Sequence, residues 1–178
     1  PGSYQGWDPT TAESIVSPTS NGIYTGIISF PEENSEFKIT TERNWANSYG
    51  QTADGKLAFN GGGNLKAPRA GNLELEVNTT ANTISYKDHS WGIIGSASPK
   101  GWDADTDMKY DNANQVWKLT VSLTAGEIKF RKNHDWGTNF GGANGTLAAG
   151  GANIAVASAG TYDIVLNLNA NTYTLTKK

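Results

Sequence analysis

The sequence contains no cysteine, which excludes disulfide bonds and thiolate metal sites. It has only two histidines and one methionine among 178 residues, and no apolar run approaches the length of a membrane span. Basic residues are not in excess, because the net charge is −3, so nothing points to nucleic acid. No stretch shows helical periodicity with capping residues, and nothing at Pro1 resembles a signal peptide.

The residues that are abundant favour strands and turns. There are six tryptophans, seven tyrosines and 21 glycines. From Trp117 to Leu123, apolar residues alternate with polar ones, and Tyr24 to Phe30 keep the same register. This period of two is typical of half-buried antiparallel strands. We therefore expect Tyr24 and Trp117 to be core residues.

The chain repeats itself. Residues 37–50 match residues 128–141, each copy opens with Gly-Ser and then Gly-Trp-Asp, and each closes with an Asn-containing hairpin. The sequence thus predicts an all-β chain of two tandem immunoglobulin-like or carbohydrate-binding-module β-sandwich domains, residues 1–87 and 88–178. Copy two has Trp91–Ile94 before its Gly-Ser, whereas copy one has only Pro1. We therefore expect the first domain to lack its opening strand and the chain to begin inside a longer protein.

A tryptophan among polar side chains indicates a ligand platform. Trp136 follows an alternating stretch in which Lys129 and Arg131 are expected to point outward, and Asn133 and Asn139 flank it. A flat apolar ring beside hydrogen-bonding groups suits a sugar, which has an apolar face and a rim of hydroxyls. The alternative is a tryptophan that caps the rim of the core.

Trp7 and Trp102, the tryptophans of the two Gly-Trp-Asp motifs, also have two interpretations, a structural one and a ligand-binding one. Each can seal one end of a sandwich, or it can pair with the later tryptophan of its copy, Trp45 or Trp136, to form a two-ring platform. Two rings set at an angle would match a curved glucan chain better than one flat surface. The repetition of both tryptophans favours the pair, although shared descent would also repeat a structural residue.

Metal binding and catalysis find little support, and we expect no cofactor. Asp103, Asp105 and Asp107 resemble the start of a calcium loop, but the required Gly and Glu are replaced by Met108 and Asn114. We expect these acidic residues to solvate a loop. No nucleophile motif is present, and no acidic pair recurs in the two tryptophan stretches, so neither the two carboxylates of a glycosidase nor another catalytic set is predicted.

Several of these residues together resemble a known protein family. Trp91-Gly92-Ile93-Ile94-Gly95-Ser96, Gly101-Trp102-Asp103 and residues 126–131 with Asp135-Trp136 resemble the C-terminal domains of SusE/SusF-type outer-membrane proteins of Bacteroidetes. The first copy is similar to the preceding domain of those proteins. The resemblance implies a lipid-anchored protein of the outer membrane and cell surface, whose anchored N-terminal portion is absent here. It would bind starch or maltooligosaccharide without catalysis, beside SusC/SusD-like uptake proteins.

The resemblance also implies site residues. In copy two the rings are Trp102 and Trp136, and the polar contacts are Lys129, Arg131, Asn133 and Asn139; in copy one the residues are Trp7, Trp45 and Lys38, with Arg43 as a compensating contact. Copy one departs from the pattern because Thr40, Glu42 and Ser48 replace Arg131, Asn133 and Asn139. Two other functions stay open: an accessory module of a secreted glycoside hydrolase, and a structural or adhesive spacer.

Overall fold

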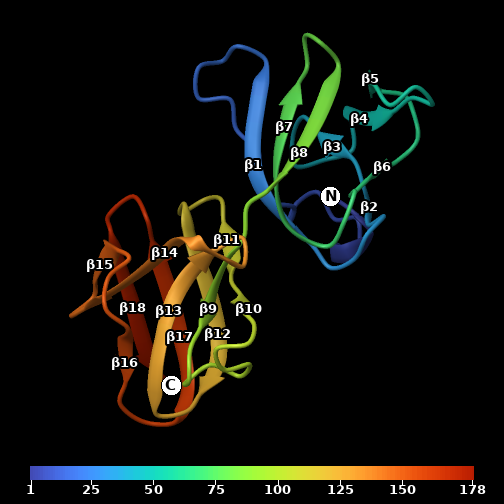
Figure 1. The fold of residues 1–178 in the computed structure, drawn as a ribbon. Helices are drawn as coiled ribbons and strands as arrows, with labels where there is room; N and C mark the ends of the chain where they lie inside the picture. Colours follow the sequence, from blue (N-terminus) through green and yellow to red (C-terminus); the bar gives the residue numbers. More distant parts are fainter. The chain divides into compact units, whose positions relative to one another are not determined.

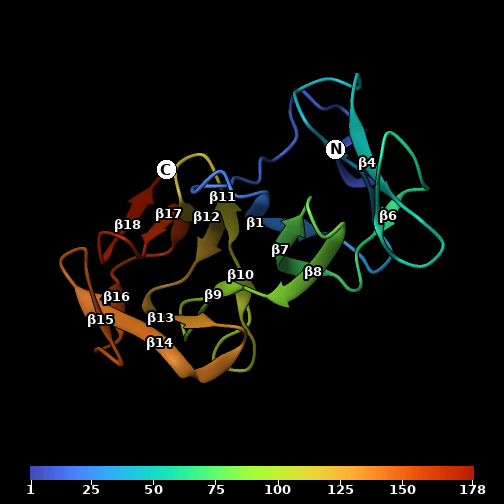
Figure 2. The same ribbon diagram turned by 90° about the horizontal axis from the view of Figure 1, so that it is seen from above.

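The computed structural model describes all residues 1–178 and divides into unit 1, Pro1–Asp88, and unit 2, His89–Lys178. The predicted all-β fold is confirmed, since apart from one short 3-10 helix, η1 (Ser3–Gln5), every regular element is a strand. Figures 1 and 2 show the strands of each unit from two directions. No helix of the structure is long and apolar enough to cross a membrane.

Unit 1 contains three small antiparallel sheets. The sheets have the orders β1-β7-β8, β2-β6 and β3-β4-β5. Their strands are β1 (Ile23–Phe30), β2 (Glu36–Phe37), β3 (Ile39–Thr40), β4 (Ser48–Gln51), β5 (Leu57–Phe59), β6 (Leu65–Lys66), β7 (Gly71–Asn78) and β8 (Thr83–Asp88). Apolar side chains of all three sheets meet in one core, which includes Phe30, Phe37, Leu57 and Leu73.

Unit 2 repeats this plan with longer strands. Its strands are β9 (Trp91–Ile94), β10 (Thr106–Asp107), β11 (Lys109–Asp111), β12 (Val116–Leu123), β13 (Gly126–Lys132), β14 (Asp135–Ala143), β15 (Thr146–Ala149), β16 (Ile154–Val156), β17 (Gly160–Asn167) and β18 (Thr172–Lys177). They follow the order β10-β9-β13-β14-β15-β18-β17-β12-β11, with β16 paired to β13. The buried side chains include Trp117, Ile128 and Phe130.

The repeat seen in the sequence is also a repeat of strand register. Phe30 pairs with Gly71 in unit 1, and Leu123 pairs with Gly160 in unit 2. Likewise, Tyr49 of β4 pairs with Ile39, as Phe140 of β14 pairs with Phe130. Because pairing register decides which face each side chain occupies, matching residues of the two units lie on matching faces.

Two core predictions have opposite outcomes. Trp117 is confirmed as a core residue because only 1% of it is exposed. The prediction for Tyr24 is wrong, since 37% of this residue is exposed. Its strand pairing is nevertheless equivalent, because Tyr24 pairs with Val77 as Trp117 pairs with Leu166. The difference lies in the neighbouring strand: Tyr110 of β11 packs its ring 4.9 Å from Trp117, whereas unit 1 has only the isolated Val16–Thr25 bridge at that edge.

Candidate carbohydrate-binding sites

The structure brings the two tryptophans of each copy together. In unit 2 the ring centroids of Trp102 and Trp136 are 6.2 Å apart with an interplanar angle of 32°, and 42% and 47% of the two residues are exposed. In unit 1 Trp7 and Trp45 are 6.3 Å apart at 42°. Each pair forms an open surface of two tilted apolar rings. Such a surface can cover the C–H faces of a curved sugar chain.

Backbone conformation places the first ring of each pair. Gly6 and Gly101, the residues before Trp7 and Trp102, have φ of 74° and 61°. No atom lies within 4 Å of a Cβ built at either glycine, so the left-handed backbone rather than lack of space selects glycine there. Trp7 itself has φ of 60°, which is costly for a bulky side chain.

Trp136 lies in a strand rather than in the loop predicted for it. It is the second residue of β14, directly after a two-residue turn formed by Asn133 and His134. Both turn residues have positive φ, 50° and 58°, as the favoured hairpin turns require. Trp45 in contrast lies between β3 and β4 in a longer loop, which is closed by a hydrogen bond from Thr41 N to Asn47 O. The two platforms are therefore held in different ways.

A buried ion pair supports the ring of Trp136. The Arg131 guanidinium carbon lies 4.8 Å from the ring centroid, close enough for a cation–π contact. Arg131 Nε donates to both carboxylate oxygens of Asp105 at 3.0 and 2.9 Å, and Nη2 donates to Oδ2 at 2.6 Å. Both side chains are buried, with exposed fractions of 9% and 1%. The arrangement fixes the guanidinium in one orientation beneath the indole.

This ion pair overturns the expectation for Asp105 and bears on that for Arg131. Arg131 stays a predicted sugar contact on the side of Trp136, but its guanidinium is buried between Asp105 and Trp136. Asp105 was expected to solvate a loop, but it is the buried partner of Arg131. Gly92 gives it room: a Cβ at Gly92 would lie 3.0 Å from the Cβ of Asp105.

The two asparagines are structural contacts in this geometry. Asn133 Oδ1 accepts a hydrogen bond from Ser90 N at 2.8 Å, so this side chain anchors the turn to the start of unit 2. Asn139 Nδ2 donates to the Trp136 carbonyl at 2.8 Å, while its buried Oδ1 has no partner. Both side chains therefore hold the backbone around Trp136, and their contact with a ligand stays a prediction.

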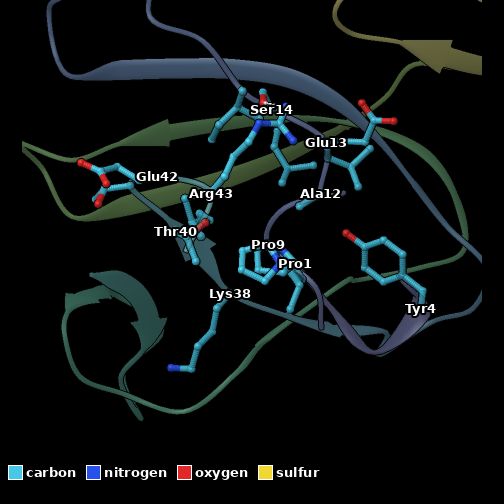
Figure 3. A pocket seen from close by; sticks show the side chains of 16 residues that line it. Pro1, Tyr4, Pro9, Ala12, Glu13, Ser14, Lys38, Thr40, Glu42 and Arg43 are labelled. Carbon is cyan, nitrogen blue, oxygen red and sulfur yellow. Dashed lines mark hydrogen bonds between the residues drawn. The ribbon is translucent and has the colours of Figure 1, made fainter. Parts of the chain in front are cut away.

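The two lysines differ in how free they are. Lys38 Nζ donates to the carbonyl oxygens of Gly62 and Gly63 at 3.2 and 3.4 Å. Figure 3 shows its side chain turned away from the neighbouring cavity. Lys129, its counterpart, is half-buried, and no hydrogen bond or ion pair of its ammonium is found. Lys129 is thus the predicted polar residue whose donors are most available to a ligand.

Contacts across the edge of each sheet complete the two sites. Arg43 Nη1 donates to the Thr10 carbonyl at 2.6 Å, and its Nη2 lies 3.5 Å from Ser14 Oγ. In unit 2, His134 Nε2 lies 2.7 Å from Asp107 Oδ1. Arg43 therefore does not stand beneath Trp45 in the way that Arg131 stands beneath Trp136. No group of three or more His, Asp or Glu side chains is placed to hold a metal ion.

Comparisons with known proteins agree with this geometry. Residues 91–174 match the model of the SusF/SusE starch-specific carbohydrate-binding modules, and residues 1–93 match the pullulanase X25 domain. The X25 match covers just over half of the chain, so the chain belongs to that family by this match, whereas the SusF/SusE match is confined to unit 2. The predicted SusE/SusF resemblance is thereby confirmed for residues 91–174, and the matched family is one of starch-specific carbohydrate-binding modules. Unit 1 is the part of the chain that matches the X25 domain.

No curated protein sequence matches the chain. The crystal structure of SusF from Bacteroides thetaiotaomicron matches with a TM-score of 0.40 and 21% sequence identity, covering 98% of this chain and 46% of that chain. The chain therefore spans less than half the length of that SusF structure.

Proposed function

We propose that the chain binds starch-type α-glucan without catalysis and that the Trp102–Trp136 pair of unit 2 is the principal contact. The observation that carries the proposal is the tilted, half-exposed ring pair in a unit of the starch-specific family. The rings cover the apolar faces of neighbouring glucose residues. Lys129, which lies on the same sheet face as Arg131, supplies donors for hydroxyl groups. The Trp7–Trp45 pair forms a second site, for which Lys38 and Arg43 are the candidate polar contacts.

Arg131 acts indirectly in this proposal. Its guanidinium is already bonded to Asp105, so it holds the Trp136 ring in position before the glucan arrives. A ring that is fixed in its bound orientation loses less conformational entropy on binding. In unit 1 Thr40 takes the place of Arg131, so the Trp7–Trp45 platform lacks this support. Unit 2 is therefore the stronger binder.

The substitution Trp136→Ala tests the platform. We expect it to weaken the binding of maltoheptaose to unit 2 by about 1–3 kcal/mol, by analogy with the replacement by alanine of aromatic side chains that stack on nucleic-acid bases. The side chain is 47% exposed, so the melting temperature should hardly change. Isothermal titration calorimetry in a Trp45→Ala background measures unit 2 alone, and differential scanning calorimetry checks the fold.

Phe59→Ala is the matched control, because Phe59 is an exposed aromatic residue, 55% accessible, outside both ring pairs. It should leave the affinity unchanged. Wild-type affinity in Trp136→Ala would overturn the platform. Loss of the fold would instead show that the ring is structural.

The cellular setting is a further part of the proposal. By resemblance to SusE/SusF-type proteins, the chain works at the outer-membrane surface of a bacterium, attached through a lipid anchor upstream of Pro1, and passes glycan to SusC/SusD-like uptake proteins. Protease accessibility on intact cells and co-purification with such a transporter test these two statements. The match of unit 1 to the pullulanase X25 domain favours an alternative, an accessory module of a glycoside hydrolase. A parent gene that encodes a glycoside hydrolase would support this alternative.

A spacer function is separated from binding by affinity electrophoresis in gels containing amylopectin. The proposal expects the chain to be retarded in these gels and not in gels without polysaccharide. An unretarded chain would favour the structural or adhesive alternative.

A further inference from the structure

The two rings of each pair lie on segments that are distant in the sequence, so contacts between these segments decide how the rings face each other. In unit 2, two side-chain contacts join the segment after the first tryptophan to the segment before the second. Arg131 donates to Asp105, and His134 Nε2 lies 2.7 Å from Asp107 Oδ1. Two contacts at neighbouring points restrict the motion of one segment against the other.

A single arginine joins the corresponding segments of unit 1. Arg43 Nη1 donates to the Thr10 carbonyl at 2.6 Å, and Nη2 donates to Ser14 Oγ at 3.5 Å. Figure 3 shows this side chain extending to Ser14. Arg43 lies two residues before Trp45, so it belongs to the loop that presents the second ring. The forked guanidinium, with several N–H donors, can serve two acceptors at once.

The acceptors of Arg43 stand where unit 2 has its two carboxylates. Thr10 lies three residues after the Gly-Trp-Asp tryptophan, as Asp105 does in unit 2. At the position of Arg131, however, unit 1 has Thr40, which cannot span this distance with a charged group. The link to the first ring segment is therefore made from a different sequence position in each unit.

The second acceptor follows the same correspondence. Ser14 lies two residues before Val16, which bridges β1. Asp107 lies two residues before Lys109, which pairs with β12, the counterpart of β1. Arg43 itself takes the position of the histidine that contacts Asp107, two residues before the second tryptophan. One guanidinium in unit 1 thus makes both links that two side chains make in unit 2.

The Thr10 carbonyl is held in place by the residue next to the first ring. Asp8 Oδ1 accepts hydrogen bonds from Thr10 N at 2.9 Å and from Thr10 Oγ1 at 2.7 Å. Asp8 directly follows Trp7, and its own carbonyl accepts a hydrogen bond from Gln5 Nε2 at 2.6 Å. Hydrogen bonds therefore run without a break from the residue after the first ring to the guanidinium.

The loop of the second ring is braced at the residue between Arg43 and Trp45. Asn44 Oδ1 accepts a hydrogen bond from Ala46 N at 2.8 Å. Asn44 Nδ2 donates to Glu42 Oε2 at 3.0 Å. These bonds restrain the backbone on both sides of Trp45, so an anchor at Arg43 also restrains the ring.

We propose that Arg43 is the positioning residue of the Trp7–Trp45 platform and that it fixes the mutual orientation of the rings by joining the two segments that carry them. It acts through the backbone of these segments and not through a cation–π contact, which distinguishes it from Arg131. A ring pair that is pre-organised in this way loses less conformational entropy when glucan binds. The inference rests on the proposed glucan binding by unit 1, but the orientation of the rings can be measured without a ligand.

Circular dichroism reports this orientation. The ultraviolet transitions of two indoles 6.3 Å apart couple, and the amplitude of the resulting couplet depends on the angle between the rings. All variants are made in the full chain with Trp136→Ala, which removes the ring pair of unit 2. Addition of Trp45→Ala gives the baseline without a pair.

We expect Arg43→Ala to reduce the couplet in this background. In calorimetry the binding of maltoheptaose should weaken by about 2- to 12-fold, the ordering cost of one side chain that binding must then immobilise. Arg43 is exposed, so the melting temperature should hardly change. Lys87→Ala is the matched control, because it removes an exposed cation from β8 of the same unit and should change neither the couplet nor the affinity.

Two further variants separate positioning from direct contact with the sugar. Asp8→Ala leaves Arg43 intact but removes the acceptor that holds Thr10, so it should also reduce the couplet. The loss in Arg43→Ala combined with Asp8→Ala should be smaller than the sum of the single losses, because both act on one run of hydrogen bonds. Arg43→Lys keeps a donor for the Thr10 carbonyl and should retain more of the couplet than Arg43→Ala.

An Arg43→Ala chain with an unchanged couplet would overturn the proposal. If that chain nevertheless bound maltoheptaose more weakly, Arg43 would be a direct sugar contact instead. Additive losses in the combination with Asp8→Ala would also count against a shared run of hydrogen bonds. If the Trp136→Ala chain shows the couplet but binds no glucan, the second binding site is refuted, while the effect of Arg43→Ala on the couplet still decides the positioning role.

Discussion

At the scale of residues, the Asp105–Arg131 pair links stability to the binding surface. Removing one member of a buried ion pair leaves the other charge buried without a partner, which typically lowers the free energy of unfolding by about 3–5 kcal/mol. Replacing both members by apolar side chains often leaves the stability unchanged. We therefore expect Arg131→Met to destabilise unit 2 strongly, and Asp105→Leu combined with Arg131→Met to restore most of the loss. Urea unfolding followed by circular dichroism measures both.

The same two variants separate folding from binding. The double variant has no cation beneath Trp136, so its affinity for maltoheptaose should stay below that of the wild type even though its stability recovers. Wild-type affinity in the double variant would show that Arg131 serves only the fold. A double variant as unstable as Arg131→Met would show that packing, rather than the stranded charge, causes the loss.

At the scale of elements, a surface carboxylate joins β11 to β12. The hydrogen bond from Lys118, at 2.6 Å, and those from Asn114 hold the pKa of Asp111 far below its ordinary value of 3.8. A folded-state pKa that is lower than the unfolded one stabilises the protein above the ordinary pKa, and this stabilisation is lost as the pH falls towards the folded value. We expect Asp111→Asn to cost up to about 1 kcal/mol at pH 7, the range of exposed ion pairs.

Below pH 3.8 the difference between Asp111→Asn and the wild type should shrink steadily. Urea unfolding at several pH values measures it. The control Asp103→Asn removes the same charge from an exposed residue of unit 2 and should give a smaller difference at pH 7. A difference between Asp111→Asn and the wild type that is constant down to pH 2 would contradict the linkage.

How much of this the sequence predicts depends on the distance between the residues concerned. Local alternation and the internal repeat predicted the strands, the matching registers and Trp117 in the core, because these follow from neighbouring residues. Asp105 lies 26 residues from Arg131 in the sequence, so no local pattern predicts their ion pair. The exposure of Tyr24 likewise depends on a neighbouring strand that unit 1 does not form.

Some of the corrected details did leave a signal. Asn133 is an asparagine between two alternating stretches, which is typical of a hairpin turn with positive φ. Gly92 interrupts the apolar stretch Trp91–Ile94, which indicates that another group approaches the backbone closely. Both signals favour a structural role for the residues around them.

At the scale of the whole molecule, two open sites in one chain predict avidity for polymers. Each platform covers one side of a few sugar units, so we expect single-site dissociation constants near 1 mM, about −4 kcal/mol. A polymer that engages both sites can gain roughly 10²–10⁴ in apparent affinity without new contacts. Retention of the wild-type chain on insoluble starch should therefore exceed that of Trp45→Ala and of Trp136→Ala.

A short ligand provides the control for this prediction. Maltotriose cannot occupy two sites, so calorimetry should show no such gain for the wild type. If Trp45→Ala is retained on starch as well as the wild type, unit 1 is a spacer or its site cannot reach the same polymer. The double variant Trp45→Ala with Trp136→Ala measures retention that does not involve the ring pairs.

The buried guanidinium beneath Trp136 also bears on the salinity that the molecule tolerates. Dissolved ions screen exposed charges within about 8 Å at physiological ionic strength, but they screen a buried pair far less. Starch itself is neutral, so no attraction between the partners can be screened. The rings bind by contact, and the one charge that orients Trp136 is matched inside the protein. We therefore expect the capture of glucan to be nearly as effective in brine as in fresh water.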